Sequence, residues 1–323
     1  MRSYLSLCVL CYALFLVLPL PFLALAASPS TEDKPTTPTA TVTTAPLTET
    51  AAVFNVLDAS ANVIYTFTER DFLIYTVAAE MPASYPLEAL KAQAVASYTY
   101  YTYQKNRELE GLHGADFSDA PSFPEAYSPE ALQERWGDNH QTYLTKIAQA
   151  VDEVLGQYIL YDGKPIFAAY HSCNSGRTAS SKTIWDTDYA YLQSVVSSGD
   201  ALSPTLTSTV TVTDAEFAAA FPNVSLTGDA ATWIGDSPTT AENGTVTAIT
   251  IGDTVFHGRD VRSALGLRSS CFTATHADGV FTFTVQGYGH GVGMSQVGAK
   301  AMAEQGFTYK EILQHYYTGV TVQ

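Results

Sequence analysis

The chain has 323 residues, of which 46% are hydrophobic, so it is long and apolar enough for one large domain or two small ones. Its formal net charge is −16 and its isoelectric point is near 4.6, which argues against a nucleic-acid-binding protein, because that function needs a basic face. The same charge disfavours broad attraction to anionic polymers. Polymer binding would then depend on shape, hydrogen bonds and aromatic faces.

Residues 1–26 are predicted to be a targeting segment, either a signal peptide or an N-terminal membrane anchor. Arg2 supplies a positive charge, a long apolar run follows, and Ala24-Leu-Ala26 suits signal peptidase, which favours cleavage. The run is also long enough to span a bilayer. Either way we expect an exported, extracytoplasmic protein that meets the membrane only through this segment.

Residues 27–50 consist mainly of Ser, Thr, Pro and Ala, and such a composition cannot bury enough apolar surface to order itself. We therefore predict a disordered linker, either a flexible tether or a spacer left after processing. Residues 51–323 are predicted to form one α+β domain.

The first predicted elements of that domain are a β-hairpin and two helices. Residues 53–68 alternate and carry a turn signal, which predicts the hairpin. A helix should follow and end near Glu80, because Pro82 disfavours helical backbone at the preceding residue. The second helix should start at Pro86, which suits a first turn, and run to about Arg107.

Later elements are predicted to be mainly strands, with two closing helices. Short strands are expected around 158–160 and 166–171, and the Thr- and Val-rich region 203–256 is expected to be an inserted β-rich subregion. A further strand is predicted over 281–285. The closing helices are predicted over 295–304 and 309–317, with Gly319 stopping the second.

Glu80 is a candidate general acid because its surroundings favour its protonated form. A carboxyl group at a helix C-terminus meets the negative end of the helix dipole, and apolar neighbours desolvate it. Both effects suit proton donation near neutral pH. The alternative is an ordinary surface glutamate beside a turn.

A second candidate is His290, in a loop with four glycines in the seven positions 287–293. Such a loop lets the backbone approach a ligand closely, at an entropic cost. His290 would then bind a ligand or orient the acid; a turn with a satisfied histidine is the alternative. Ser295 and Gln296, just beyond, could hydrogen-bond the ligand, and Ser295 could equally be only a helix N-cap.

Two motifs carry a family resemblance. Glu80-Met-Pro-Ala-Ser84, followed by Glu88-Ala-Leu-Lys-Ala-Gln-Ala94, resembles a signature of the stage II sporulation protein D family, which includes the domain called amidase enhancer. Gly287-Tyr-Gly-His-Gly-Val-Gly-Met-Ser-Gln-Val-Gly-Ala299 resembles the family's C-terminal signature. Both occur in the family's order, and the resemblance covers roughly residues 52–323.

The resemblance implies a peptidoglycan lytic transglycosylase that remodels the cell wall, with sporulation as the setting and Glu80 as the catalytic acid. A hydrolase would normally need two carboxyl groups. A lytic transglycosylase needs one, because the sugar's own 6-hydroxyl attacks the anomeric carbon and gives a 1,6-anhydro product. The alternative is a non-catalytic wall-binding module that modulates an amidase, possible because fold does not fix function.

Other residues near the motifs have open roles. Gln93 could face the cleft or solvent, and Glu88 could be a second carboxylate or an exposed first-turn charge. Tyr98, a further candidate for substrate binding, stands where the family commonly has a cleft arginine, and the absence of that arginine would leave Glu80 less paired. Trp185 and Tyr191 could stack on sugars, although core packing is the commoner use of such residues.

No cofactor is predicted, and a structural zinc site is possible but disfavoured. His171-Ser-Cys173 invites a zinc hypothesis with Cys271 and His290. Some family members bind zinc through a different segment, but here it carries Phe117 and Phe123 where cysteines are expected, which suggests an apolar contact and a surface role for His113. Cys173 and Cys271 are instead predicted to form a disulfide, with two buried free thiols as the alternative.

Overall fold

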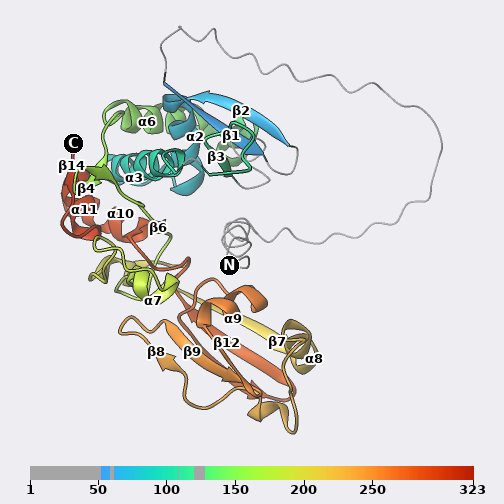
Figure 1. Ribbon diagram of the computed structural model, residues 1–323. Helices are drawn as coiled ribbons and strands as arrows, with labels where there is room; N and C mark the ends of the chain where they lie inside the picture. The colour runs from blue at the N-terminus through green and yellow to red at the C-terminus, as the bar shows by residue number, and fades with distance from the viewer. Residues whose placement is uncertain (1–51, 59–61, 108, 120–127) are drawn as a thin grey trace.

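The computed structural model describes residues 52–58, 62–107, 109–119 and 128–323, and within them the fold is α+β with small, mostly antiparallel sheets, as predicted. Figure 1 shows two lobes. The first lobe comprises the described residues between 52 and 206 together with 287–323, and the second lobe comprises residues 207–286. Each lobe has a hydrophobic core of its own. The predicted targeting segment and linker lie outside the described residues, among which no helix is both long and apolar enough to cross a bilayer.

The predicted hairpin and first helix are confirmed. Strands β1 (Val53–Asp58) and β2 (Val63–Thr68) pair antiparallel, and β3 (Phe117–Asp119) joins β1 in parallel. Helix α2 (Glu69–Glu80) begins where the Thr68 hydroxyl accepts a bond from the Asp71 N–H at 3.1 Å. It ends at Glu80 because Met81, before Pro82, is extended (φ −129°, ψ 136°).

Helix α3 (Leu87–Lys105) lies at the centre of the first lobe and is almost entirely buried (Figure 1). Its alanines have no exposed surface, and small side chains allow the surrounding helices to approach closely. The helices that pack on it are α2, α6 (His140–Asp152), α10 (Gln296–Glu304) and α11 (Tyr309–Tyr316). Helix α6, and α5 (Pro129–Trp136) before it, were not predicted, although Leu144, Ile147 and Val151 recur at helical spacing.

Short elements complete the first lobe. Strands β14 (Thr321–Val322), β4 (Ile159–Tyr161) and β5 (Lys164–Pro165) form one small sheet, and β6 (Tyr170–His171) pairs in parallel with β13 (Met294–Ser295). The strand expected over 166–171 is thus confirmed only at its end. The remaining elements are α7 (Ser181–Trp185) and the 3₁₀ turns η1 (Gly137–Asn139) and η2 (Ser198–Leu202).

The second lobe is larger than the insertion predicted over 203–256. Strand β7 (Thr207–Thr213) pairs with β12 (Val280–Gln286), which pairs with β11 (Phe272–Ala277), so the lobe extends to residue 286. The pairing of β7 with β12 joins strands far apart in the chain, so the local sequence pattern does not indicate it. The lobe also contains helices; its other elements are α8 (Asp214–Ala220), η3 (Ala230–Thr232), β8 (Thr239–Thr240), β9 (Val246–Ile251), β10 (Thr254–Phe256) and α9 (Gly258–Leu265).

Candidate active site

Glu80 is half-buried at the C-terminal end of α2, where the side chain of Gln296 meets it. Gln296 Nε2 donates to Glu80 Oε2 at 3.4 Å and to Gln93 Oε1 at 3.2 Å. Gln93 is fully buried and donates its own Nε2 to Ser97 Oγ at 3.0 Å. The structure therefore brings Glu80, Gln93 and Gln296 together and settles which way Gln93 faces.

Ser295 is buried behind this group and acts as a helix cap. Its Oγ accepts a bond from the Gly298 N–H at 3.1 Å, which makes it the N-cap of α10. The same Oγ donates to Asp200 Oδ1 at 2.6 Å. Because Ser295 has no exposed surface, it cannot touch a ligand as proposed from the sequence, and its contact with the site runs through Gln296.

Asp200, on η2, was not singled out from the sequence. Burial raises the pKa of Asp200, and the bonds that it accepts from Ser197, Ser295 and Asn174 act against that shift. Nothing in the local sequence marks this aspartate, because its donors come from three separate segments.

His171 belongs to the same polar cluster and is not arranged as a metal ligand. Its Nδ1 lies 3.1 Å from the Val292 carbonyl oxygen and its Nε2 lies 3.1 Å from Asn174 Nδ2. These partners assign the proton to Nδ1. Burial lowers the pKa of His171 to about 4, so the ring is neutral at pH 7. Among the described residues, no group of three or more His, Cys, Asp or Glu side chains is placed to hold a metal.

The glycine-rich loop lies against the chain's own backbone. Gly287, Gly289, Gly291 and Gly293 all have positive φ, between 72° and 110°. A Cβ on Gly293 would overlap the carbonyl oxygen of Ala169, and one on Gly289 would crowd His171. The glycines are therefore explained by packing on residues 169–174, whereas the sequence suggested approach to a ligand.

His290 is half-buried at the tip of this loop, and its Nδ1 accepts a bond from the Val292 N–H at 3.1 Å. Its ring centroid lies 5.1 Å from that of Trp185. Burial and the neighbouring His171 lower the pKa of His290, so the ring is neutral. Tyr191 is buried in the core and accepts a bond from the Phe167 N–H, so of the two aromatic candidates only Trp185 lies beside His290.

Tyr98 and Glu88 have contacts elsewhere. Tyr98 donates to Glu69 Oε2 at 2.5 Å and stacks on Tyr158, so its hydroxyl reaches the first residue of α2, whereas Glu80 is the last. Tyr98, predicted to bind substrate, therefore directs its hydroxyl to the end of α2 opposite to Glu80. Glu88 accepts from Lys91 Nζ and from the Tyr309 N–H, both at 2.8 Å, which is a structural role.

The predicted disulfide is not present: Cys173 and Cys271 are both free thiols. Cys173 is fully buried and interacts with the hydroxyls of Ser203 and Thr205, whereas Cys271 lies 3.7 Å from the Asn243 carbonyl oxygen. The two thiols thus face different partners. Burial raises the pKa of both.

The segment considered for zinc is only partly described. Phe117 is buried, with its ring 5.6 Å from Phe54 and from Phe72 and 4.7 Å from Tyr101, an apolar contact of the kind predicted. His113 is exposed. Phe123 lies outside the described residues.

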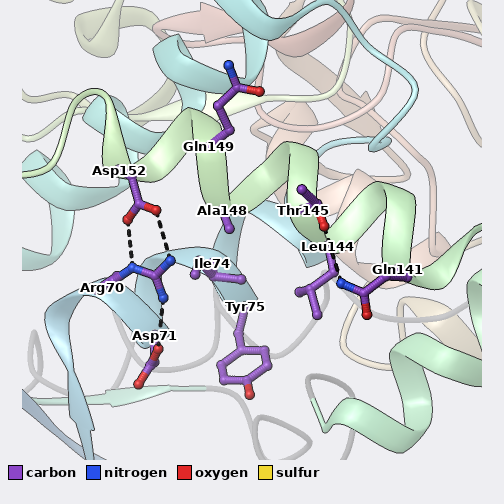
Figure 2. Close-up of a pocket in the computed structure, with 10 residues that line it drawn as sticks. All are labelled: Arg70, Asp71, Ile74, Tyr75, Gln141, Leu144, Thr145, Ala148, Gln149 and Asp152. Carbon is purple, nitrogen blue, oxygen red and sulfur yellow. Dashed lines mark hydrogen bonds and ion pairs between the residues drawn. The ribbon is translucent and has the colours of Figure 1, made fainter.

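A groove of about 500 Å³ lies between α2 and α6 (Figure 2). The Arg70–Asp152 ion pair, at 2.6 Å, lies at one end, and Tyr75 points into the space beside Asp71. Asp71 precedes Glu80 by about two and a half helical turns, so the two residues lie on opposite sides of α2. The groove is therefore separate from the Glu80 site.

Three relatives resemble this chain over most of its length. Stage II sporulation protein D of Bacillus subtilis (strain 168) is 37% identical over 257 residues, which are 78% of this chain and 74% of that protein. Stage II sporulation protein D of Bacillus amyloliquefaciens is 36% identical over 255 residues, covering 78% and 73%. The amidase enhancer of Bacillus subtilis (strain 168) is 27% identical over 301 residues, covering 75% and 39%.

The fold and the site define a two-lobed α+β protein with a half-buried glutamate at a helix end, bonded by the side-chain amide of Gln296, which Gln93 holds in turn. Residues 58–161 match the family described as "Stage II sporulation protein". With the similarity to the two sporulation proteins, this match shows that the chain belongs to the stage II sporulation protein D family.

Proposed function

We propose that this protein is an exported lytic transglycosylase that cleaves peptidoglycan glycan strands between N-acetylmuramic acid and N-acetylglucosamine during the wall remodelling of sporulation. The observation that carries the proposal is the contact of Glu80 with Gln296, which is itself held by Gln93. All three lie within the two motifs that carry the family resemblance. The side-chain amide of Gln296 holds the Glu80 carboxyl group within hydrogen-bonding distance, and a fixed carboxyl group suits a residue that must both give and take a proton.

The reaction needs two proton transfers at Glu80. The carboxyl group protonates the glycosidic oxygen as the bond to the anomeric carbon breaks. The resulting carboxylate takes the proton of the muramic 6-hydroxyl while that oxygen bonds to the anomeric carbon. The ring closes to the 1,6-anhydro sugar, no water is consumed, and intramolecular attack replaces a second carboxylate.

His290 and Trp185 are proposed to bind the glycan near Glu80. Both are half-buried, their ring centroids lie 5.1 Å apart, and the indole of Trp185 offers a face for a sugar ring. Neither group adds positive charge, in keeping with a chain of net charge −16. Recognition is then expected to depend on hydrogen bonds and stacking.

The test is incubation of the protein with purified glycan strands and mass spectrometry of the products. We expect 1,6-anhydro ends, and E80Q should slow their formation at least about a hundredfold, the usual contribution of general acid–base catalysis. The control E304Q makes the same substitution at an exposed glutamate on α10 and should keep full activity. Products that have gained water would show hydrolysis and contradict the proposal.

A second candidate is a non-catalytic wall-binding module that modulates an amidase. The specific observation in its favour is the 27% identity to the amidase enhancer. If this candidate holds, the glycan stays uncut by the purified protein, while an added wall amidase works faster in its presence. E80Q should then stimulate the amidase as well as the wild type does.

A further inference from the structure

Asp200 is a fully buried carboxylate behind the Glu80 site. Removing a carboxylate from water is costly unless hydrogen bonds replace the lost solvent. Here Oδ1 accepts from Ser295 Oγ at 2.6 Å and from the Asn174 N–H at 3.0 Å, while Oδ2 accepts from Asn174 Nδ2 at 3.3 Å and from Ser197 Oγ. The cluster joins the loop at 174, the turn η2 and the start of α10.

We infer that Asp200 is a positioning residue for Glu80, acting through the N-terminus of α10. The inference rests on the proposed function for its catalytic consequence, but its structural part stands on the contacts alone. The path has two links, the hydroxyl of Ser295 and the side-chain amide of Gln296.

The first link fixes the cap of α10. Asp200 Oδ1 lies 2.6 Å from Ser295 Oγ and the other acceptor, the Ser172 carbonyl oxygen, lies 3.4 Å away, so Ser295 directs its hydroxyl proton to Asp200. A lone pair of Ser295 Oγ is then available to the Gly298 N–H at 3.1 Å. Asp200 thereby sets both the direction of the serine hydroxyl and the start of the helix.

The second link is Gln296, the first residue of α10. Gln93 uses its nitrogen on Ser97 Oγ, so its oxygen must accept from Gln296. That arrangement turns Gln296 Nε2 toward Glu80 Oε2. A shift of the helix start would move this amide relative to Glu80.

Close packing transmits the position of η2 to α10. A Cβ on Gly298 would collide with the hydroxyls of Ser197 and Tyr316, and a Cβ on Gly199 would collide with the side chain of Ala301. The turn and the helix therefore lie in direct contact, with no space for independent movement.

The experiment is D200N, read by the side-chain amide resonances of Gln296 in the ¹⁵N-labelled protein, which Q296E identifies by their loss. Asparagine keeps the shape of the side chain, but its NH₂ group then faces a donor at one of the two oxygen positions. We expect the Gln296 resonances to shift or broaden. We also expect kcat for glycan cleavage to fall about tenfold to a hundredfold, the scale of a misplaced catalytic group, with KM within about twofold.

The matched control is D214N, which removes a carboxylate that bonds His276 Nε2 at 2.8 Å in the second lobe. It should leave the Gln296 resonances, kcat and KM unchanged. If D200N fails to fold, S295A takes its place, because alanine removes the hydroxyl link without adding bulk, and the same shift is expected.

Unchanged Gln296 resonances in the folded variant would overturn the inference, and Asp200 would then only hold loops together. Wild-type protein that leaves glycan uncut would count against the proposed function instead. In that case the amide resonances alone still decide whether Asp200 positions Gln296.

Discussion

The two lobes differ in what they bury. The first lobe encloses a set of hydrogen-bonded polar side chains within its core, whereas the second lobe buries a cluster of aromatic and aliphatic side chains. The polar set of the first lobe includes Gln93, Ser97, His171, Asn174, Ser197, Asp200, Ser295 and Gln296. In the described part of the second lobe, the buried polar side chains are Thr245, Ser269 and Ser270.

The comparison locates the candidate site in the first lobe. Buried polar groups cost free energy unless each finds a partner, so a concentrated set of them needs a compensating role. In this protein the set includes Gln296, which contacts Glu80, and His171, whose Nδ1 lies 3.1 Å from the Val292 carbonyl oxygen in the glycine-rich loop. The second lobe follows the simpler pattern of a sheet with an apolar inner face and a threonine-rich outer face, and we interpret it as support for the site.

The largest expected effect is on the stability of the second lobe. Phe283 has no exposed surface and its ring lies 5.8 Å from that of Phe272. F283A should lower the free energy of unfolding by about 3–5 kcal/mol, measured by urea denaturation, because it removes transfer energy and leaves a cavity. The control T284A, on the exposed face of the same strand, should change it by less than about 0.5 kcal/mol.

The same variant, F283A, tests whether the second lobe takes part in glycan cleavage. Under conditions where F283A is folded, its glycan cleavage should stay within about twofold of the wild type, since the second lobe holds none of the polar cluster. A folded F283A protein that has lost cleavage would show that the second lobe takes a direct part in the site.

The next effect concerns the polar core of the first lobe at acid pH. Burial lowers the pKa of His171 to about 4, while an unfolded histidine has a pKa of about 6.5. Between these values the unfolded chain binds more protons, so stability falls as the pH falls from about 6.5 to 4. The loss attributable to His171 should reach up to about 3 kcal/mol.

The measurement is the free energy of unfolding from pH 7 to pH 4 in the wild type and in H171Q, which cannot titrate. Asp200, whose pKa burial raises, is present in both proteins, so the difference between the two curves isolates the histidine. Parallel curves would show that His171 does not lose its proton affinity on folding.

The smallest effect is expected at the cysteines. Because Cys173 and Cys271 are free, a chain lacking residues 1–26 should show two reactive thiols when it is denatured without reductant. Reductant should change the free energy of unfolding by less than about 0.5 kcal/mol. A disulfide closing a loop of about one hundred residues would instead contribute about 4–5 kcal/mol, and no thiols would react.

Local sequence signals predicted the helix boundaries around the site well. Pro82 sets the end of α2 at Glu80, Pro86 precedes the first residue of α3, and Ser295 caps α10. Each of these depends on interactions within about four residues, the range over which backbone restriction and capping act. The same signals placed Gln296 one residue after the cap.

The side-chain contacts between these helices and their neighbours could not be predicted, because they join residues far apart in the chain. Periodicity left the direction of Gln93 open, since α3 is buried on all sides. It gave no sign that Tyr98 would bond Glu69 at the far end of α2. The predicted insertion ended at residue 256, too early, because the central pairing of the second lobe, β7 with β12, depends on a strand that starts at residue 280.

The sequence by itself determined the family, the α+β class and the helix end that presents Glu80, because motifs and helix boundaries are local properties. Only the tertiary structure decided that the glycines around His290 pack on the chain's own backbone, that the two cysteines stay apart, and that Asp200 lies behind α10. These features depend on which surfaces meet when the core forms. Burial and packing fix that choice for the whole fold at once.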